Sequence, residues 1–393
     1  ARKVRSLSCS SAKGYRLRLR SCVVTELLLP WAHIERASLV TFLPIRDTVA
    51  RGSTPLNWLE RFQPGVFHLS KGNKSMAKRR LAITAALAAF AIALTGCSSS
   101  DSSADGFVGV ILPDAASSAR WETADRGFLQ AAFDAAGVKV DIQNANGDKA
   151  AFQTIADQML SAGAKVLIMV NLDSDSAKAV QDKAAAQGVP TIDYDRLTLN
   201  GSASYYVSFD NEAVGRLQGE GIKACLDGAG KTKARLVYLN GSPTDNNATL
   251  FKAGYDSVLR PSIDAGDYTL VDDQAVPDWD NVKGGTIFEQ QLSKAGGKLD
   301  AVVSANEGLG LAAVAVLKKN GLNGKVCVSG QDATVDGLRA ILTGDLSNTV
   351  YKAIKAEAEA AAALAIALLK GESATTATGS VDNGVTDVPS VLL

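Results

Sequence analysis

Asparagine, aspartate, arginine and tryptophan recur directly after the apolar runs of this sequence, and these residue types could bind a polyhydroxyl ligand. The segments that carry them are DAASSARW (114–121), NANG (144–147), NLDSD (171–175), DYDR (193–196), NGSPTDNNA (240–248), VPDWDN (276–281), SANEG (304–308) and SGQDA (329–333). Carboxylates accept hydrogen bonds from sugar hydroxyls, guanidinium groups donate them in a fork, and amides do both. Tryptophan offers a flat apolar face to the C–H side of a pyranose ring.

A repeat of short apolar runs and helical stretches positions these polar segments. The first series of predicted buried strands is 107–113, 139–146, 165–172 and 189–195, and the second is 234–241, 268–276, 299–307 and 324–332. Gly137, Gly163 and Gly188 stand where helix C-caps belong. This alternation predicts doubly wound α/β domains, in which ligands bind at the carboxyl ends of parallel strands.

Two similar series indicate two lobes. The extended runs 204–211 and 346–352 are candidate crossings between them, an alanine-rich helix follows at 353–371, and 383–393 would form a third crossing. We therefore expect an N-terminal lobe of 106–209 plus 350–378 and a C-terminal lobe of 210–349 plus 379–393, joined by a three-strand hinge.

Each polar segment also has a purely structural interpretation. Trp121 could be a core aromatic, Asp195 and Arg196 a strand-end ion pair, and Lys352 a solvated helix residue. The segments 245–247 and 331–332 could simply cap the helices that follow them. Their recurrence at strand ends in both series favours a binding site.

Composition narrows the chemistry. Both histidines, His33 and His68, precede residue 76, so 97–393 lacks the commonest general base and metal ligand. Residues 1–80 hold 16 of the 41 basic and 4 of the 41 acidic residues, which leaves 97–393 with a net charge of −12. This balance argues against nucleic acid as a partner. Cysteine spacing indicates no metal site. In an exported protein Cys225 and Cys327 could form a disulfide, but we expect two buried thiols.

An export signal is predicted at 76–96. Three basic residues follow Met76 closely, and the uncharged run 81–96 is shorter than the about 20 residues of a membrane-spanning helix. The next residues, LTGC (94–97), resemble the lipobox of bacterial lipoproteins, which implies lipidation of Cys97 and anchoring on the outer face of the cytoplasmic membrane, or a periplasmic location. Residues 97–105 would form a serine-rich tether.

The segment before Met76 needs a separate interpretation, because a signal peptide acts from the N-terminus. We interpret Met76 as the true start and 1–75 as upstream sequence wrongly assigned to the protein, without stable structure. A small domain in 1–75 is the alternative, and a buried alanine- and leucine-rich helix is the alternative for 76–96.

Eight segments form a further pattern: ARW (119–121), QNANG (143–147), YDR (194–196), SFDNEAVGRLQ (208–218), GSPTDNNATLFKAG (241–254), SGQDA (329–333), TVYK (349–352) and NGVTDVPSVLL (383–393). Together they resemble the periplasmic sugar-binding proteins of the ribose/galactose type and, within that group, most resemble the D-xylose-binding proteins of ABC importers. The resemblance covers 106–393. It implies a type I periplasmic binding protein-like fold.

The resemblance also implies roles for individual residues. The implied sugar-binding residues are Arg120, Trp121, Asp195, Arg196, Asn246, Asn247, Trp279, Asn306, Asp332 and Lys352. The two tryptophans would stack on opposite faces of one ring, and Lys352 would lie near the hinge. The sequence does not choose between Asn246 and Asn247.

The implied function is capture of a monosaccharide, D-xylose by preference, by lobe closure and delivery to an ABC permease with its ATPase. No cofactor, metal or catalysis is implied, and the chain has no G-x-x-x-x-G-K-[ST] loop for ATP. Glucose, arabinose or ribose as ligand, or delivery to a sugar sensor, remain alternatives. A secreted carbohydrate enzyme with Asp195 and Asp332 as acid and base is a further alternative. A LacI-type regulator is another alternative, but it would need a helix-turn-helix and a basic face, and this chain has a lipobox-like segment and a net charge of −12 over 97–393 instead.

The sequence departs from the family pattern at three places. The loop before Arg120 consists of the small residues PDAASSA (113–119) instead of acidic or amide residues, and Glu307 should alter one wall of the site. The family also continues beyond the DVPSVLL segment with which this chain ends. We therefore expect the last segment of the second lobe to be absent.

Overall fold

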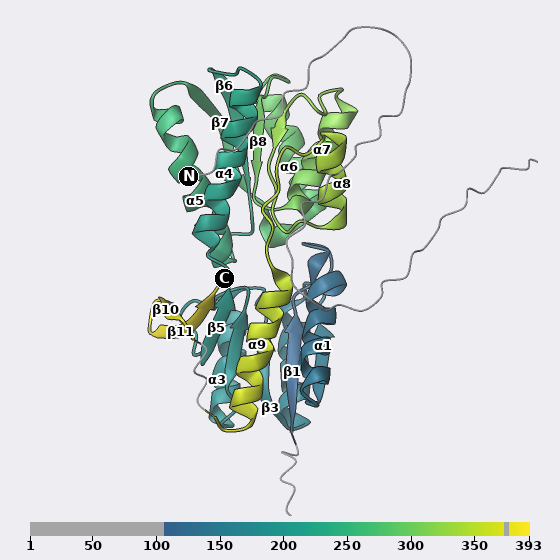
Figure 1. The fold of residues 1–393 in the computed structure, drawn as a ribbon, viewed down its shortest axis with the longest axis vertical. Coiled ribbons are helices and arrows are strands. Elements are labelled where there is room, and N and C mark those ends of the chain that lie inside the picture. The colour runs from purple at the N-terminus through teal and green to yellow at the C-terminus, as the bar shows by residue number, and fades with distance from the viewer. Residues whose placement is uncertain (1–105, 373–376) are drawn as a thin grey trace, which may run out of the picture. The chain divides into compact units, whose positions relative to one another are not determined.

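The computed structural model describes residues 106–372 and 377–393 (Figure 1). The predicted leader (1–75), signal peptide (76–96) and tether (97–105), with the predicted lipidation site Cys97, lie outside the described residues. Within the described ranges, no helix combines the length and the apolar character needed to cross a bilayer.

The first of two sheets contains seven strands. They are β1 (Phe107–Leu112), β2 (Val140–Asn144), β3 (Ala164–Met169), β4 (Thr191–Tyr194), β5 (Tyr205–Ser208), β10 (Gly379–Asp382) and β11 (Asp387–Leu392). Their order is β10-β11-β5-β4-β3-β1-β2, and β1 to β5 are parallel. β1 to β4 correspond to the four predicted apolar runs, whereas β5 lies in 204–211, which was predicted only as a crossing.

Helices cover both faces of this sheet. They are η1 (Trp121–Asp125), α1 (Arg126–Ala135), α2 (Lys149–Ser161), α3 (Ser174–Ala186) and α9 (Ile354–Leu369). Successive strand residues point to opposite faces. Val110 of β1 therefore packs in one cluster with Phe133 of α1 and Ala361 of α9. Its neighbour Ile111 packs on the other face with Phe152 of α2. This is the doubly wound arrangement.

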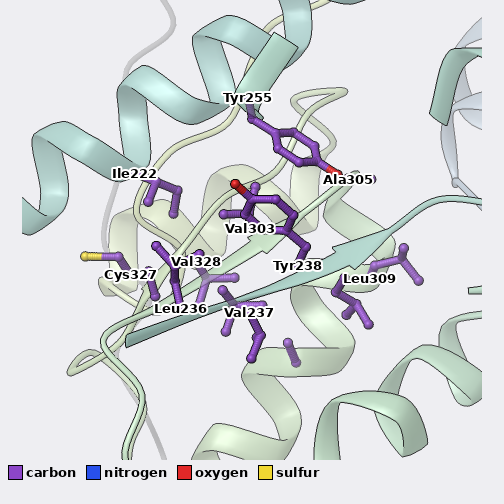
Figure 2. Packing of buried hydrophobic residues seen from close by; sticks show 14 of the residues in the cluster. Ile222, Leu236, Val237, Tyr238, Tyr255, Val303, Ala305, Leu309, Cys327 and Val328 are labelled. Atoms are coloured by element: carbon purple, nitrogen blue, oxygen red, sulfur yellow. The ribbon is translucent and has the colours of Figure 1, made fainter. Parts of the chain in front are cut away.

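The second sheet consists of four parallel strands. They are β6 (Ala234–Asn240), β7 (Tyr268–Ala275), β8 (Ala301–Ser304) and β9 (Cys327–Val328), in the order β7-β6-β8-β9. Its helical segments are α4 (Asn211–Gly228), α5 (Asn246–Asp264), η2 (Pro277–Trp279), α6 (Asn281–Lys294), α7 (Glu307–Lys319) and α8 (Val335–Thr343). Figure 2 shows part of the hydrophobic core of this half, with Tyr238 and Tyr255 among its side chains. The two rings pack edge to face, and their centres are 4.9 Å apart.

The chain passes between the two sheets at the first two of the three predicted crossings. After β5 it runs through Phe209 and Asp210 into α4, which packs on α5 of the second sheet. On the way back, Val350 pairs with Gln331 before α9 returns to the first sheet.

The C-terminal segment differs from the prediction. Residues 379–393 were expected in the second lobe, with 383–393 as a third crossing. Instead, β10 and β11 form an antiparallel hairpin, and β11 joins β5 in parallel at the edge of the first sheet. Buried Val388 and Val391 anchor the hairpin there. A short extended run fits a crossing and an edge strand equally well, so its sequence pattern could not separate them.

The two cysteines also correct the prediction. Cys225 on α4 and Cys327 on β9 form a disulfide with a Cα–Cα distance of 6.1 Å, instead of two thiols. The packing of α4 against β9 brings together residues 102 positions apart, which no local pattern reveals.

Removing this disulfide should destabilise the protein. In the chain-entropy account, closing a loop of about 100 residues contributes about 4.7 kcal/mol, because it restricts the unfolded chain. The double variant Cys225→Ser/Cys327→Ser should therefore unfold at a lower urea concentration than the wild type, as followed by circular dichroism. Reductant should shift the wild type towards the variant and leave the variant unchanged. Coincident transitions for oxidised wild type and variant would contradict the disulfide.

Candidate functional site

A cavity lies at the carboxyl ends of both sheets, where parallel α/β folds place their ligands. It encloses about 310 Å³ of space free of protein atoms, part of it open to solvent. The lining residues are Ser117, Ser118, Arg120, Trp121, Asp195, Arg196, Asp245, Asn247, Phe251, Trp279, Asn306, Gln331, Asp332 and Lys352. We call this space the first cavity.

Arg120 and Trp121 enter the first cavity where η1 begins, shortly after β1. This segment is a π-helix, a local distortion often found at functional sites. The Trp121 indole donates to Ser117 Oγ at 3.2 Å, and the Arg120 guanidinium lies 4.4 Å from the centre of the Trp121 ring. Trp121 also belongs to the apolar cluster of the first sheet, so it is a core residue and a cavity wall at once.

Asp195 is the centre of the polar network. Its Oδ2 accepts from Arg120 Nη1 at 2.8 Å and from Lys352 Nζ at 3.1 Å, and its Oδ1 accepts from Asn247 Nδ2 at 3.2 Å. Burial opposes its charge, but Lys352, Arg120 and Arg196 together outweigh burial and lower the pKa of Asp195. The residue has φ 62°, a left-handed conformation that aspartate and asparagine tolerate better than most residues.

Asp245, which the sequence suggested only as a helix cap, connects the two sheets. It caps α5 by accepting from the Asn247 backbone N–H at 2.9 Å. Its Oδ2 also accepts from the Trp279 indole at 3.0 Å and lies 3.0 Å from Arg196 Nε of the first sheet. Burial raises the pKa of Asp245, although Arg196 partly opposes this.

Two further contacts join the second sheet to the loop after β1. Asn306 caps α7 and donates to the Ser117 carbonyl at 3.1 Å. Asp332 accepts from Ser118 Oγ at 2.8 Å and lies 3.9 Å from Lys352 Nζ. Burial raises the pKa of Asp332, despite the opposing charges of Lys352 and Arg120. The small loop thus brings its serines directly against the second sheet.

Two sequence expectations need adjustment. Asn247 is buried and lines the first cavity, whereas Asn246 is half-buried and outside it. Glu307 does not line the first cavity. Its carboxylate points to Thr334 and Thr349, whose hydroxyls donate to it, and so ties α7 to α8 and to the second crossing.

Five lining residues were not among the predicted site residues: Ser117, Ser118, Asp245, Phe251 and Gln331. The serines belong to the loop that was noted only for its small residues. Asp245 and Gln331 stood beside predicted residues but were interpreted as caps. Phe251 lies in the segment 241–254, but an apolar residue inside a helix gives no signal of its own.

A buried ionic network connects Arg120 and Asp195, which line the first cavity, to residues outside it. Arg120 donates to both oxygens of Asp125 and to Glu357 Oε2 at 2.6 Å, besides its bond to Asp195. Tyr194 donates to Asp125 Oδ1 at 2.7 Å. One guanidinium therefore serves three buried carboxylates, and burial raises the pKa of Glu357 although Arg120 opposes this.

Asp193, a buried residue of β4, should give the protein a pH-dependent stability. Burial raises its pKa to about 7, and hydrogen bonds from Thr198 and Gln181 oppose this only in part. Between about pH 4 and 7 the folded protein keeps a proton that the unfolded chain has lost, so the free energy of unfolding falls as pH rises through this range.

The variant Asp193→Asn, which is neutral at every pH, should lack this contribution. Its stability relative to the wild type should increase from pH 4.5 to 7.5 by about 3 kcal/mol, measured by urea unfolding at each pH. A constant difference between the two proteins across this range would contradict a buried, protonated Asp193.

The chemistry of the first cavity is that of a binding site for a neutral polar molecule. Guanidinium, ammonium, carboxylate and amide groups alternate around it, and two indoles form part of its wall. Within the described ranges, no cluster of three or more histidine, cysteine, aspartate or glutamate side chains could hold a metal ion. The arrangement offers donors and acceptors to several hydroxyl groups at once.

Comparison with known proteins gives consistent results. The profile of a family described as periplasmic binding protein domain matches residues 108–373. The chain is 36% identical over 274 residues to the D-xylose-binding periplasmic protein of Escherichia coli (strain K12), covering 70% of this chain and 81% of that protein. It is also 36% identical over 311 residues to the D-xylose-binding periplasmic protein of Haemophilus influenzae, covering 79% and 91%.

A solved structure shares the fold. It is an ABC transporter solute binding protein from Clostridium phytofermentans with bound β-D-glucose. The two align with a TM-score of 0.66 and 30% identity, over 73% of this chain and 91% of the other.

Proposed function

Because this chain belongs to the family of periplasmic binding proteins, we propose that it captures a monosaccharide, D-xylose by preference, in the first cavity and delivers it to an ABC permease. The observation that carries this proposal is the convergence of Asp195, Asn247 and Asp332 with two indoles, all buried side chains, on one cavity. The relatives named above are binding proteins, and this chain, like them, is not an enzyme.

In this proposal the two sheets hold the sugar from opposite sides. Asp195 and Asp332 accept from its hydroxyls, Arg120, Arg196 and Lys352 donate to it, and Asn247 and Asn306 do both. Trp121 and Trp279 cover the apolar faces of the ring. Ser117, Ser118, Asp245 and Gln331 support these side chains or share in the contacts.

Lobe closure would couple binding to recognition by the permease. The contacts Ser118–Asp332, Ser117–Asn306 and Arg196–Asp245 join the two sheets across the first cavity. Sugar that contacts both sheets favours the conformation in which they meet, and so shifts the population towards it. The permease and its ATPase would then respond to the closed form.

D-xylose is our first choice because two relatives at 36% identity carry that sugar in their names. A relative at 35% identity is named a multiple sugar-binding protein, so other aldoses are the second candidate. Calorimetric titration of the full chain with D-xylose, D-glucose, L-arabinose and D-ribose tests the choice. Tightest binding of D-xylose is expected, and equal or tighter binding of another sugar would contradict it.

Lipid anchoring at Cys97 completes the proposed function. Mass spectrometry of protein purified from membranes should find a diacylglycerol on Cys97, and Cys97→Ser should release the protein from them. A membrane-bound Cys97→Ser variant without lipid would contradict this part of the proposal.

The neighbouring asparagines allow a matched test of the site. Asn247→Ala should weaken D-xylose binding about 10- to 100-fold, because it removes a buried amide that also donates to Asp195. Asn246→Ala should change the dissociation constant less than about threefold, because Asn246 lies outside the first cavity. Equal losses in the two variants, measured by calorimetry, would contradict the assignment.

A further inference from the structure

A second, larger cavity adjoins the first. It encloses about 720 Å³, against about 310 Å³ for the first, part of both being open to solvent. Its lining residues are Asp114, Ala116, Ser117, Asn146, Gly147, Lys149, Leu172, Arg196, Ser242, Thr244, Asp278, Trp279, Asp280 and Lys283. They come from the loops and helix starts that follow β1, β2, β3 and β4 of the first sheet and β6 and β7 of the second.

Three side chains line both cavities: Ser117, Arg196 and Trp279. The boundary between the two spaces is therefore only one side chain thick at these positions. Like the first cavity, the second is bordered by direct contacts between the sheets. Thr244 Oγ1 donates to the Leu172 carbonyl at 3.0 Å, and Asn281 Nδ2 donates to the Ala116 carbonyl at 2.6 Å. A ligand that extends from the first cavity into the second would still contact both sheets.

The backbone around Trp279 is specialised to place its indole at this boundary. Asp278 and Trp279 have φ 59° and 54°, a left-handed conformation that is unusual for a tryptophan. The Asp278 N–H donates to Ser242 Oγ at 3.1 Å, and the indole donates to Asp245 at 3.0 Å. Gly241 leaves room for the ring, since a Cβ there would lie 2.0 Å from it. Strain of this kind persists where the surrounding structure enforces it and is concentrated at functional sites.

The charges of the second cavity point to a neutral ligand. Lys283 lies 2.9 Å from Asp278, Lys149 lies 3.0 Å from Asp173, and Arg196 lies 3.0 Å from Asp245. Each cation that lines the cavity thus already has a carboxylate partner, and no excess positive charge is available for a phosphate or a uronic acid. The walls combine the apolar Trp279 and Leu172 with hydroxyl and amide groups, which is the surface that a second sugar ring requires.

We infer that the second cavity binds the second ring of a neutral disaccharide whose first ring occupies the first cavity. This inference rests on the proposed function, because it assumes a sugar in the first cavity. Trp279 would contact both rings, one from each cavity. The protein would then accept short oligosaccharides in addition to the monosaccharide.

Calorimetric titration of the full chain with D-xylose and with β-1,4-xylobiose tests this inference. Wild-type protein should bind xylobiose with a dissociation constant within about tenfold of that for xylose. The double variant Lys149→Leu/Lys283→Leu removes two hydrogen-bond donors from the second cavity, one beside each sheet, and neither residue lines the first cavity. It should weaken xylobiose binding by about tenfold or more and change xylose binding less than about threefold.

The matched control is Lys178→Leu/Lys319→Leu. These lysines form surface ion pairs with Asp182 and Glu289 outside both cavities, so the control should bind both sugars like the wild type. Failure of wild-type protein to bind xylobiose while it binds xylose would overturn the inference and leave the proposed function standing. Undiminished xylobiose binding by the double variant would also overturn it. Failure to bind xylose at all would overturn the proposed function, and this inference with it.

Discussion

Arg120→Met should lower the free energy of unfolding by about 3–5 kcal/mol or more, because breaking a buried ion pair by removing one partner leaves an uncompensated charge. Here one guanidinium contacts Asp125, Asp195 and Glu357, and all four side chains are buried. Methionine would fill the space of the Arg120 side chain with apolar atoms, but it could not donate hydrogen bonds to the three carboxylates. Urea unfolding followed by circular dichroism measures the effect.

The pH dependence of the Arg120→Met variant should distinguish charge from packing. Arg120 helps to lower the pKa of Asp195 and opposes the rise that burial imposes on the pKa of Glu357, so both pKa values should be higher in the folded variant. The folded variant then binds protons that the unfolded chain has released. The stability deficit of the variant should therefore shrink as pH falls from 7 to 5. Arg216→Met is the control, since Arg216 pairs with Glu220 on an exposed helix surface and should cost at most about 1 kcal/mol. Similar deficits for the two variants would contradict the network.

Asp195→Asn should weaken D-xylose binding about 100-fold while the protein remains folded. Asparagine keeps the shape of the side chain and tolerates the left-handed backbone of Asp195. It removes the charge that holds Arg120 at 2.8 Å and Lys352 at 3.1 Å, and it weakens the proposed bonds to sugar hydroxyls. A hydrogen bond that involves a charged group contributes about 1.5–3 kcal/mol, which corresponds to a loss of about 10- to 150-fold.

The control for this change is Asp182→Asn. Asp182 pairs with Lys178 at the surface, so the exchange removes the same charge without reaching the first cavity. Circular dichroism at the titration temperature should show both variants folded. Xylose binding by Asp195→Asn that matches the control would show that Asp195 does not contact the sugar.

Most of the fold could be predicted from the sequence, because buried parallel strands and glycine-capped helices leave a local signal. Val110 and Ile111 stand in a continuous apolar run, and each faces a different helical layer. The C-terminal hairpin and the Cys225–Cys327 disulfide depend instead on contacts between distant segments. Neither local periodicity nor composition encodes such contacts, and both predictions for these regions were wrong.

The part of the candidate site that could be predicted is the set of polar residues directly after predicted strands, because parallel α/β folds bind ligands at the carboxyl ends of their strands. That rule pointed to Asp195 and Asp332, which the structure brings to the same cavity. It could not choose between Asn246 and Asn247, because successive residues on a helix point about 100° apart and the phase of α5 depends on packing. It also treated capping and lining as alternatives, whereas Asp245 does both.

The central claim is that one sugar contacts both sheets at the first cavity, and hydrogen–deuterium exchange with and without saturating D-xylose tests it most directly. The account predicts slower exchange in peptides that contain 117–121 and 195–196 of the first sheet's loops, and 245–247 and 331–332 of the second. The same sugar should leave peptides on the outer surface of α3 and α8 unchanged. Protection confined to the loops of one sheet, or no protection in folded protein, would contradict the claim.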